Sequence, residues 1–492
     1  MPFLYATLIS TLPGANIFAS ALIILIVVVC LQQLVYAMMG TMLPRSGFDY
    51  VANSRMLSPA IGFAFGWIIV IAWLLLGASY ADLTGTVFLQ PLLASIGQTA
   101  LANSLSVPAI RIGLDTAFVM LGTVVTLLSI RTFARIQTIC VVGGIIAMVL
   151  MFALFGSLAM QGFSKVFDSV AGTGAYQGVI AKAQGAGSTP SMYDFSFQQT
   201  LLGAPILLYY TQGLGPTAVF GEFRTVSKTM IYTMFIAPLV AWILLTGMAV
   251  LYYPALGVDF AHAISYLSVA NPSASPFGAN PFLNSILTFL YPGSPAVLII
   301  DLGIWLSGFL LIPQSMLFCS RYIFAWSFDR IIPEKFSTIS RFRTPWVTAL
   351  TVTVLTELIL LFYVFTGVIG ALLNSALLFT PIAIGVGLSS ALIPYRAKSK
   401  AWFENAPSFA KAKIGPIPFV VIGGLASAVG FIILTGAVVA FPQIGYPVSG
   451  LNVEFQVGMF ILAIVVYYLV RAYRSRKEGF DIALNFSEIP PE

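Results

Sequence analysis

Long runs of apolar residues dominate this chain, and short segments that carry most of its charge separate them. A helix needs about 20 apolar residues to cross the hydrocarbon core of a bilayer. Only 8% of the 492 residues are Asp, Glu, Lys or Arg, whereas about a quarter are charged in a typical soluble domain. So few charges cannot cover a soluble surface. The sequence therefore predicts an all-α integral membrane protein with lipid as its solvent.

Eleven runs are long enough, or nearly long enough, to span a membrane. They cover residues 15–42, 60–90, 113–131, 136–160, 197–220, 229–253, 295–326, 345–366, 369–394, 417–441 and 454–472. An apolar stub at residues 1–12 precedes them and is too short to cross. The loops 162–196 and 255–294 are not predicted to form separate soluble domains.

The positive charges test this division of the chain. If the segment after the 15–42 run faces the cytoplasm and the runs then alternate, twenty of the 23 Lys and Arg residues fall on the cytoplasmic side. These are Arg45, Arg55, Arg131, Arg135, Arg224, Lys228, Arg321, Arg330, Lys335, Arg341, Arg343, Arg396, Lys398, Lys400, Lys411, Lys413, Arg471, Arg474, Arg476 and Lys477. Only Arg111, Lys165 and Lys182 remain outside. Positively charged loops resist translocation, so this bias predicts a multi-pass protein with a cytoplasmic C-terminus.

Several functional classes find no support in the residues. The net charge of +6 is spread over short loops and not over one basic face, which argues against nucleic-acid binding. The single histidine, His262, lies in a predicted outer loop and is expected to be solvated. Cys30, Cys140 and Cys319 lie in or beside apolar runs and are expected to pack there. No phosphate-binding loop or nucleophile elbow occurs. The sequence thus predicts no enzyme, no cofactor and no metal site.

The most informative run is QQTLLGAPILLYYTQGLGPTAVFGEFR at 198–224, which contains Gly213, Gly215 and Pro216 near its middle. In a helix interior Gly costs about 1 kcal/mol and Pro about 3 kcal/mol, so this helix is predicted to unwind there. In lipid, freed backbone groups are tolerated only where they line a cavity or bind something. The ends of the two half-helices would carry partial charges suited to a zwitterion or an ion. The alternative is a simple proline kink packed against its neighbours.

The residues around this break are the predicted binding site for a small-molecule substrate. We expect the substrate to lie near Tyr209, Gln212, Gly213, Leu214 and Gly215. Unwound backbone would bind its polar groups, and Tyr209 would cover its side chain.

Several segments resemble permeases of the amino acid–polyamine–organocation (APC) superfamily. MMGTMLPRSGFDYVANSRMLSPAIGFAFGW at 38–67 resembles the PRSGG-[DE]-Y loop between the family's second and third helices, with Phe48 in place of a second Gly. ARIQ at 134–137 resembles the start of helix 5, and GEFRTVSK at 221–228 resembles the end of helix 6. SRYIFAWSFDRIIPEKF at 320–336 resembles the stretch after helix 8, and the tail is similar to that of prokaryotic members.

This resemblance implies a LeuT-type fold: two inverted five-helix repeats followed by two extra helices. One transmembrane domain at 1–472 would then contain repeats at 1–160 and 197–394 and the extra helices at 417–472, before a cytoplasmic tail at 473–492. The resemblance also implies a secondary transporter of amino acids or related amines in the plasma membrane of a prokaryote.

The N-terminus departs from that pattern. If 197–220 corresponds to helix 6, five spans should precede it, but only four complete ones do. We therefore expect that the first helix is truncated, with the stub at 1–12 in place of its outer half, and that the sequence as given begins late. In a complete protein of this length, the central site would lack half of its walls.

Charged residues at the predicted inner helix ends are candidates for a gate. Asp49, Glu222, Arg321 and Asp329 all lie there, and ion pairs among them would close the exit to the cytoplasm. The alternative is that they only set topology and solvate the surface.

Acidic residues inside apolar runs are functional candidates, because a charge at the bilayer centre costs about 2.5–3.5 kcal/mol on insertion scales. Asp301 is a candidate for an outer vestibule or gate. For Glu357 a partner in the bundle, a neutral acid facing lipid and a coupling role remain open. Asp82 and Asp115 lie near predicted outer ends, where we expect water to reach them and their roles to be structural.

The coupling ion, proton or sodium, is left open. Some proton-coupled relatives carry a lysine in helix 5, but the ARIQ alignment places Gly144 there and the 136–160 run has no lysine. Ser307 on helix 8 is a candidate sodium ligand. The substrate's identity, the choice among symport, antiport and uniport, and the oligomeric state also stay open. The main alternative function is a non-transporting membrane sensor or subunit that retains the permease scaffold.

Overall fold

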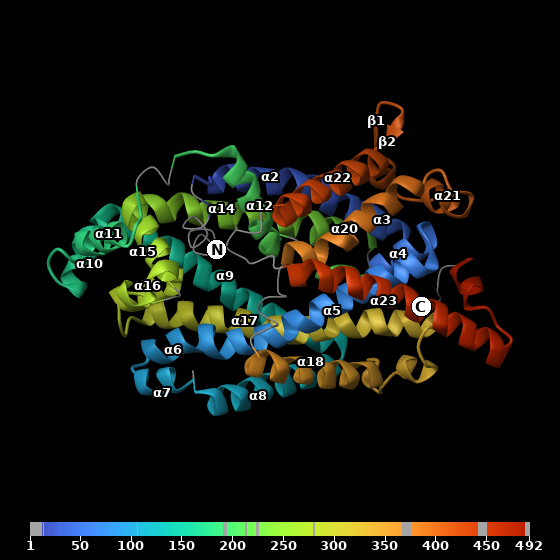
Figure 1. Ribbon diagram of the computed structural model, residues 1–492, viewed down its shortest axis with the longest axis horizontal. Helices are drawn as coiled ribbons and strands as arrows, with labels where there is room; N and C mark the ends of the chain where they lie inside the picture. Colours follow the sequence, from blue (N-terminus) through green and yellow to red (C-terminus); the bar gives the residue numbers. More distant parts are fainter. Residues whose placement is uncertain are drawn as a thin grey trace.

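The computed structural model describes residues 12, 14–105, 107–189, 194–211, 214–222, 226–278, 281–366, 375–440 and 450–487. These residues form an all-helical bundle (Figure 1). Within the described ranges the only strands are the short antiparallel pair β1 (Lys413–Ile414) and β2 (Ile417–Pro418).

Nine helices in these ranges are long and apolar enough to cross a membrane. They are Ile17–Met42 (α2 Ile17–Ile24, η1 Leu25–Gln33, α3 Leu34–Met42), Pro59–Ser95 (α5 Pro59–Leu83, η2 Thr84–Leu89, α6 Gln90–Ser95), α8 (Pro108–Leu127), α9 (Ile130–Gln161), Val226–Leu256 (α13 Val226–Ile231, η6 Tyr232–Ile236, α14 Ala237–Leu256), α17 (Pro295–Phe328), α18 (Trp346–Thr366), α22 (Phe419–Ala440) and Leu451–Glu478 in α23 (Gly450–Glu478). The chain is therefore a multi-pass membrane protein, as predicted.

Two predicted spans are less regular. The 197–220 run yields α12 (Phe197–Thr211), which ends after 15 residues. The 369–394 run yields α20 (Ser375–Leu392), whose described part bends by 84° into α21 (Ala397–Glu404) and counts with it as a possible tenth span. The total of eleven stays a prediction, and the stub at 1–11 lies outside the described residues.

The predicted limits 113–131 and 136–160 are wrong at their ends. Pro108 occupies the first turn of α8, where a missing N–H costs nothing, so α8 begins earlier than its apolar run. The Ser129 side chain accepts a hydrogen bond from the Thr132 amide and caps α9, so the polar residues before 136 are helical as well.

Shorter elements connect the spans. The helices are α4 (Phe48–Met56), α7 (Thr99–Ser104), α10 (Phe163–Ala171), α11 (Ala175–Gly185), α15 (Val258–Ala270) and α16 (Leu283–Leu290), and the 3-10 turns are η4 (Gly215–Ala218), η5 (Phe220–Glu222), η7 (Pro272–Ala274), η8 (Glu334–Ser337), η9 (Ser408–Lys411) and η10 (Ile482–Ser487).

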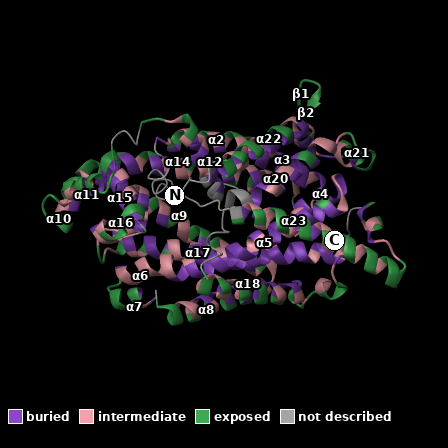
Figure 2. Ribbon diagram, in the orientation of Figure 1, coloured by how far each residue is buried: buried purple, intermediate pink, exposed green. Residues whose placement is uncertain are grey.

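Helices α5 and α17 run side by side through the middle of the bundle (Figure 1). Buried residues make up 72% of the most apolar window of the Pro59–Ser95 helix but only 11% of that of Leu451–Glu478. Figure 2 shows the same contrast between α5 and α23. Helices α8 and α18 cover one side of the central pair, and α20 and α22 pack together on the other side.

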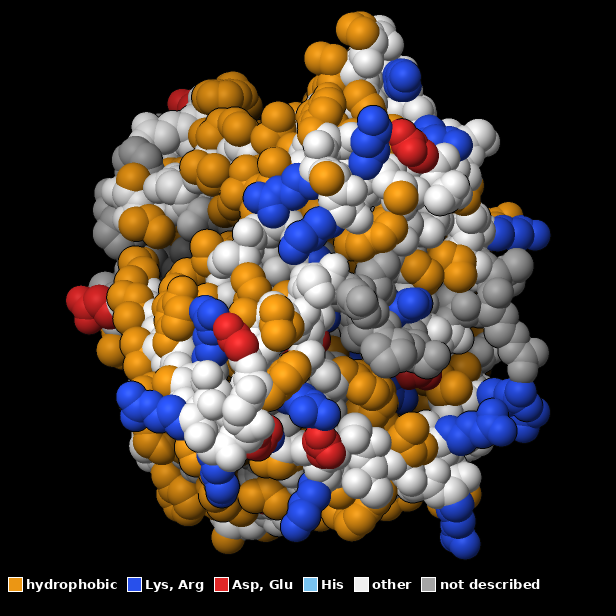
Figure 3. Space-filling view, turned by 90° about the vertical axis from the view of Figure 1, so that its right-hand side faces the viewer, with side chains coloured by type: hydrophobic (Ala, Val, Ile, Leu, Met, Phe, Trp, Pro, Cys, Tyr) orange, Lys and Arg blue, Asp and Glu red, His pale blue; other side chains and the backbone are white. Residues whose placement is uncertain are grey.

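Charge separates the two ends of the bundle. The helices α4 and α21, the β1–β2 hairpin and the last turns of α23 lie at one end, which we call the basic end (Figure 1). Figure 3 looks onto this end, where many Lys and Arg side chains are spread over the surface. The helices α6, α7, α10, α11, α15 and α16 gather at the opposite end.

Glycines bring α20 and α22 into close contact. A Cβ atom at Gly424 would lie 1.8 Å from the Ser390 hydroxyl oxygen and 2.7 Å from the Gly387 carbonyl oxygen. Small residues at helix contacts let backbones approach closely in membranes, where no hydrophobic effect drives association.

We expect Gly424→Ala to lower the thermal unfolding midpoint in detergent. The hydroxyl of Ser390 can rotate away, but the backbone of Gly387 cannot, so overpacking should cost about 1–3 kcal/mol. Gly436→Ala is the matched control on the same helix, because nothing lies within 4 Å of its Cβ position. Equal midpoints for the two variants would contradict the close contact.

Candidate functional site

The helix predicted to break does break. The described part of α12 reaches Thr211, Leu214 is not helical, residues 215–218 form the 3-10 turn η4, residues 220–222 form η5, and the described part of α13 starts at Val226. Pro216 lies in the first turn of η4, where it needs no amide hydrogen bond. Gln212 and Gly213 lie outside the described residues, as does the side chain of Tyr209.

The described residues of the break are pressed against α17. Leu214 is only 1% exposed, and Gly215 is buried. A Cβ atom at Gly215 would lie 2.2 Å from Cε2 of Phe318 on α17, so a side chain does not fit here unless that ring moves. The break is therefore part of the packed interior and is not a kink facing lipid.

An aromatic wall continues from this contact. Trp73 of α5 packs edge-on against Phe318 and against Phe379 of α20, with ring centroids 5.0 Å apart in both pairs. The buried Trp73 Nε1 donor has no hydrogen-bond partner in the described part of the chain. We refer to Trp73, Phe318 and Phe379 as the aromatic wall. Sequence reasoning missed it, because single aromatic residues in apolar runs give no signal of their own.

The loop between α3 and α4 satisfies part of the broken backbone. The Gly47 amide donates a hydrogen bond of 3.0 Å to the Ala218 carbonyl, and Ser46 forms an antiparallel bridge with Val219. Gly47 has a φ of 64°, in the left-handed region that favours glycine. The two segments whose motifs were recognised separately in the sequence thus form one structural unit.

Asp49 joins the same unit, and it forms no ion pair with the residues that the structure describes. It is fully buried, and the hydroxyls of Thr217 and Tyr322 both donate to its Oδ2 atom. These two hydroxyl oxygens are 3.0 Å apart, and Thr217 also donates to the Leu214 carbonyl at 2.6 Å. Burial raises the pKa of Asp49, which stands outside the spanning helices. The role of Asp49 in a gate stays a prediction.

The other three gate candidates do form ion pairs. Arg321 binds Glu222 across 2.5 Å, so two of the four candidates pair with each other and join α17 to η5. Asp329 instead receives both terminal nitrogens of Arg55, at 2.6 and 2.8 Å, together with the hydroxyl of Tyr50. Such two-point pairs between Arg and a carboxylate are strong and directional. We call the Arg55–Asp329 and Glu222–Arg321 pairs the latch; they lie at the basic end.

The C-terminal tail contacts the Arg55–Asp329 pair of the latch. The Arg55 guanidinium lies 4.7 Å from the centroid of the Phe486 ring, and Asn485 donates to the Asp329 carbonyl at 3.2 Å. Arg471 holds Asp481 through two hydrogen bonds of 2.6 and 2.8 Å and lowers the pKa of that carboxyl. The sequence predicted a cytoplasmic tail at 473–492 but gave no sign of these contacts.

The buried acids differ in how they are paired. Asp301 is fully buried and accepts hydrogen bonds from Asn284 at 2.9 Å and Thr288 at 3.1 Å, so it ties α17 to α16; its role as a gate stays a prediction. Glu357 has a partner within the bundle, because Thr116 donates to it at 2.5 Å.

Asp82 and Asp115 do not have the access to water expected for helix ends. Asp82 is 3% exposed and Asp115 fully buried, because α5, α8 and α18 pack around them. Asp82 pairs with Arg111 at 2.5 Å.

Ser307 and Gly144 face each other between α17 and α9. Ser307 donates to the Gly303 carbonyl at 2.9 Å, and a Cβ atom at Gly144 would lie 2.3 Å from the Ser307 hydroxyl oxygen. This packing is too close for a lysine at position 144. The sodium-ligand role of Ser307 stays a prediction.

His262 is not the solvated residue that was expected. It lies half-buried on α15, with its ring 6.0 Å from that of Tyr253. Burial lowers its pKa to about 4, because the charged imidazolium is disfavoured there.

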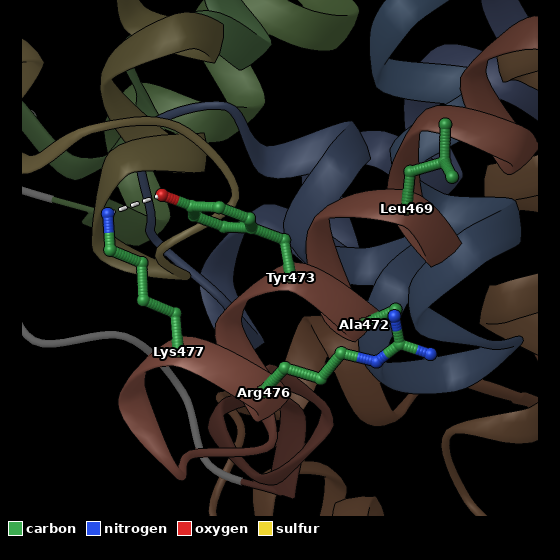
Figure 4. A pocket seen from close by; sticks show the side chains of 5 residues that line it. All are labelled: Leu469, Ala472, Tyr473, Arg476 and Lys477. Carbon is green, nitrogen blue, oxygen red and sulfur yellow. Dashed lines mark hydrogen bonds between the residues drawn. The ribbon is translucent and has the colours of Figure 1, made fainter.

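One surface groove lies near the end of α23 and is lined by Leu469, Ala472, Tyr473, Arg476 and Lys477 (Figure 4). Lys477 Nζ lies 2.7 Å from the Tyr473 hydroxyl oxygen. All five residues belong to one helix, so the groove is an open face of α23 and not an enclosed substrate site.

Comparisons with known proteins agree with this architecture. Residues 2–470 match the profile of a family described as amino acid permease. The fold is similar to the crystal structure of MhsT in complex with L-phenylalanine, with 12% sequence identity, a TM-score of 0.50, and coverage of 88% of this chain and 94% of that one. Among curated proteins, none matches. At this identity the likeness to MhsT concerns the fold alone, which is of the LeuT type that the resemblance implied.

The Asp49 cluster yields a stability prediction. Asp49→Ala leaves the Thr217 and Tyr322 hydroxyls without their shared acceptor and should cost about 1–3 kcal/mol. Asp49→Asn keeps an acceptor oxygen without the charge and should cost less, as thermal unfolding in detergent would show.

The stability difference between the wild type and Asp49→Asn should change with pH in one direction. Because the folded-state pKa of Asp49 is raised above 3.8, the wild type should lose stability relative to Asp49→Asn as the pH rises from 3.8 through the raised value. A difference that stays constant with pH would contradict the buried carboxyl.

Proposed function

The chain belongs to the amino acid permease family, and from that premise we propose that it carries amino acids or related amines across the plasma membrane of a prokaryote by alternating access. The observation that carries the proposal is the loss of regular α-helix over residues 214–222, where Gly215 packs against Phe318 of the aromatic wall. We assign residues 1–160 and 197–394 to the two repeats and 417–472 to the two extra helices.

The substrate's charged groups are proposed to bind at the break, near Tyr209, Gln212, Gly213, Leu214 and Gly215. The C-terminal end of α12 supports this placement, because the last carbonyls of a helix lack partners within it and carry partial negative charge. An ammonium group is the natural ligand for such an end.

The substrate's side chain is proposed to lie against the aromatic wall. Trp73, Phe318 and Phe379 adjoin Gly215 through the Phe318 contact, and their rings offer apolar surface together with the Trp73 Nε1 donor. MhsT, the protein of similar fold, was crystallised in complex with L-phenylalanine. We therefore propose apolar and aromatic amino acids as the preferred class.

The basic end is proposed to face the cytoplasm, with the C-terminus on that side. Lys and Arg residues gather at this end, and positive loops are retained inside. In this orientation the latch closes the inward exit, and its two ion pairs must separate when the substrate leaves.

Uptake into proteoliposomes tests the function. Purified protein is offered a panel of labelled amino acids and amines, and we expect saturable uptake that an excess of unlabelled substrate abolishes. Specific binding without flux across the whole panel would overturn the carrier and favour the sensor.

We expect Gly215→Ala to reduce uptake strongly, because its methyl group must displace the Phe318 ring at an overpacking cost of about 1–3 kcal/mol. The double variant Gly215→Ala/Phe318→Leu should recover part of the lost rate, since leucine frees the space. A Gly215→Ala protein with wild-type KM and kcat would show that this contact does not matter for transport.

The latch makes a separate prediction. Glu222→Gln removes one ion pair and should speed substrate exchange, because the open exit becomes less costly to reach. Glu334→Gln is the matched control at the same end, where Glu334 forms only an exposed pair of 3.6 Å with Arg330. Identical exchange rates in both variants and the wild type would remove Glu222 from the gate.

A further inference from the structure

A second polar cluster lies inside the bundle, between α5, α8 and α18. Asp82 on α5 pairs with Arg111 on α8 at 2.5 Å, and Thr116 on α8 donates to Glu357 on α18 at 2.5 Å. The cluster is separate from the break and from the aromatic wall, and none of the contacts described for the substrate site involves it.

Asp115 is the member without a partner. Its side chain is fully buried, and neither carboxylate oxygen accepts a hydrogen bond from any described residue. The side chain points toward η2, which continues α5, because a Cβ atom at Gly85 would lie 3.2 Å from Asp115 Oδ1. The titratable and charged groups around it are Asp82 from α5, Arg111 from its own helix, and Glu357 and Tyr363 from α18.

The charges of this cluster do not balance when every group is ionised. Three carboxylates face one guanidinium, and Asp82 already uses that guanidinium. Neighbouring carboxylates in a site of low dielectric cannot both remain ionised at low cost, so such a pair holds a proton. A proton on Asp115 would also give its carboxyl a hydrogen to donate toward Asp82.

A metal ion is a poorer occupant of the site. Across the described residues, no three His, Cys, Asp or Glu side chains are arranged to hold one. The Arg111 guanidinium also adds a positive charge that would repel a cation.

One helix joins this cluster to the substrate site. Asp82 lies on α5 just before the π-helical turn η2, and Trp73 of the aromatic wall lies on the same helix. Nine residues separate them, or about 14 Å at the rise of an α-helix. A change at the acid pair that shifts or rotates α5 would therefore move the wall. π-helical turns are frequent at functional sites.

We propose that Asp115, together with Asp82, is a proton-binding site whose occupancy is coupled to transport. This inference rests on the proposed function and assigns the coupling ion as a proton. Substrate binding and proton binding must then strengthen or weaken each other by the same factor.

Two transport assays on proteoliposomes separate this inference from the function itself. Uptake is measured with and without an imposed inward proton gradient, and counterflow of the same substrate is measured at equal pH. A pH-sensitive dye inside the vesicles reports proton entry when substrate is added. Asp115→Asn is the test variant, because its amide resembles a permanently protonated carboxyl. Asp259→Asn, at an exposed acid on α15, is the matched control.

We expect the wild type and Asp259→Asn to respond to the gradient and to acidify the lumen. Asp115→Asn should lose both responses but keep counterflow. Gradient-driven uptake that survives in Asp115→Asn, or wild-type counterflow without any response to the gradient, would overturn the inference. Absence of wild-type counterflow would instead count against the proposed function.

An infrared measurement tests the site without transport. The wild-type protein should show the absorption of a protonated buried carboxyl, which shifts in heavy water and is lost in Asp115→Asn. A spectrum in which wild type and variant agree would overturn the inference whatever the transport assays give.

Discussion

A helix that is interrupted inside a bilayer must find partners for the backbone groups that it frees, because no water is present to take them. Here the loop between α3 and α4 supplies them: Gly47 donates to the Ala218 carbonyl, and Ser46 bridges to Val219. The same loop leads directly into α4, whose Asp49 accepts hydrogen bonds from Thr217 and Tyr322. The break, the loop and the basic end of α17 therefore form one hydrogen-bonded unit, and the rest of the site is arranged around it.

This unit explains why the latch is built as it is. Arg55 follows Asp49 on the same short helix, and its partner Asp329 comes at the end of α17, the helix whose Phe318 touches the break. A movement of α4 away from α17 would strain the Asp49 cluster and the Arg55–Asp329 pair together. The tail would be affected as well, because Phe486 lies on the Arg55 guanidinium and would have to move with it or lose this contact. If the basic end opens as we propose, the opening would therefore require several contacts to break together and not one ion pair alone.

Features that depend on local composition, such as the helix break and the membrane topology, could be predicted from the sequence. Contacts between residues far apart in the chain could not. Gly213, Gly215 and Pro216 indicate a break by their own cost in a helix, and charged loops indicate topology by their own charge. Glu222, Arg321 and Asp329 were all predicted to lie at inner helix ends, but the sequence does not tell which cation meets which acid. The partner of Asp329 is Arg55, 274 residues away, which the sequence assigned only to the cytoplasmic side. Asp115 was misjudged because closeness to a helix end implies water only when no neighbouring helix covers that end.

The buried acids of this protein show how one physical rule separates structure from function. Asp301 and Asp49 are buried as deeply as Asp115, but Asn284 and Thr288 donate to Asp301, and two hydroxyls donate to Oδ2 of Asp49. Oδ1 of Asp49 has no partner among the described residues, so only one of its two oxygens is satisfied. Asp115 lies beside another carboxyl with both oxygens unpartnered in the described structure. Burial alone therefore does not single out Asp115. It differs from Asp301 and Asp49 because neither of its oxygens has a donor among the described residues, and in our proposal a proton is the missing partner.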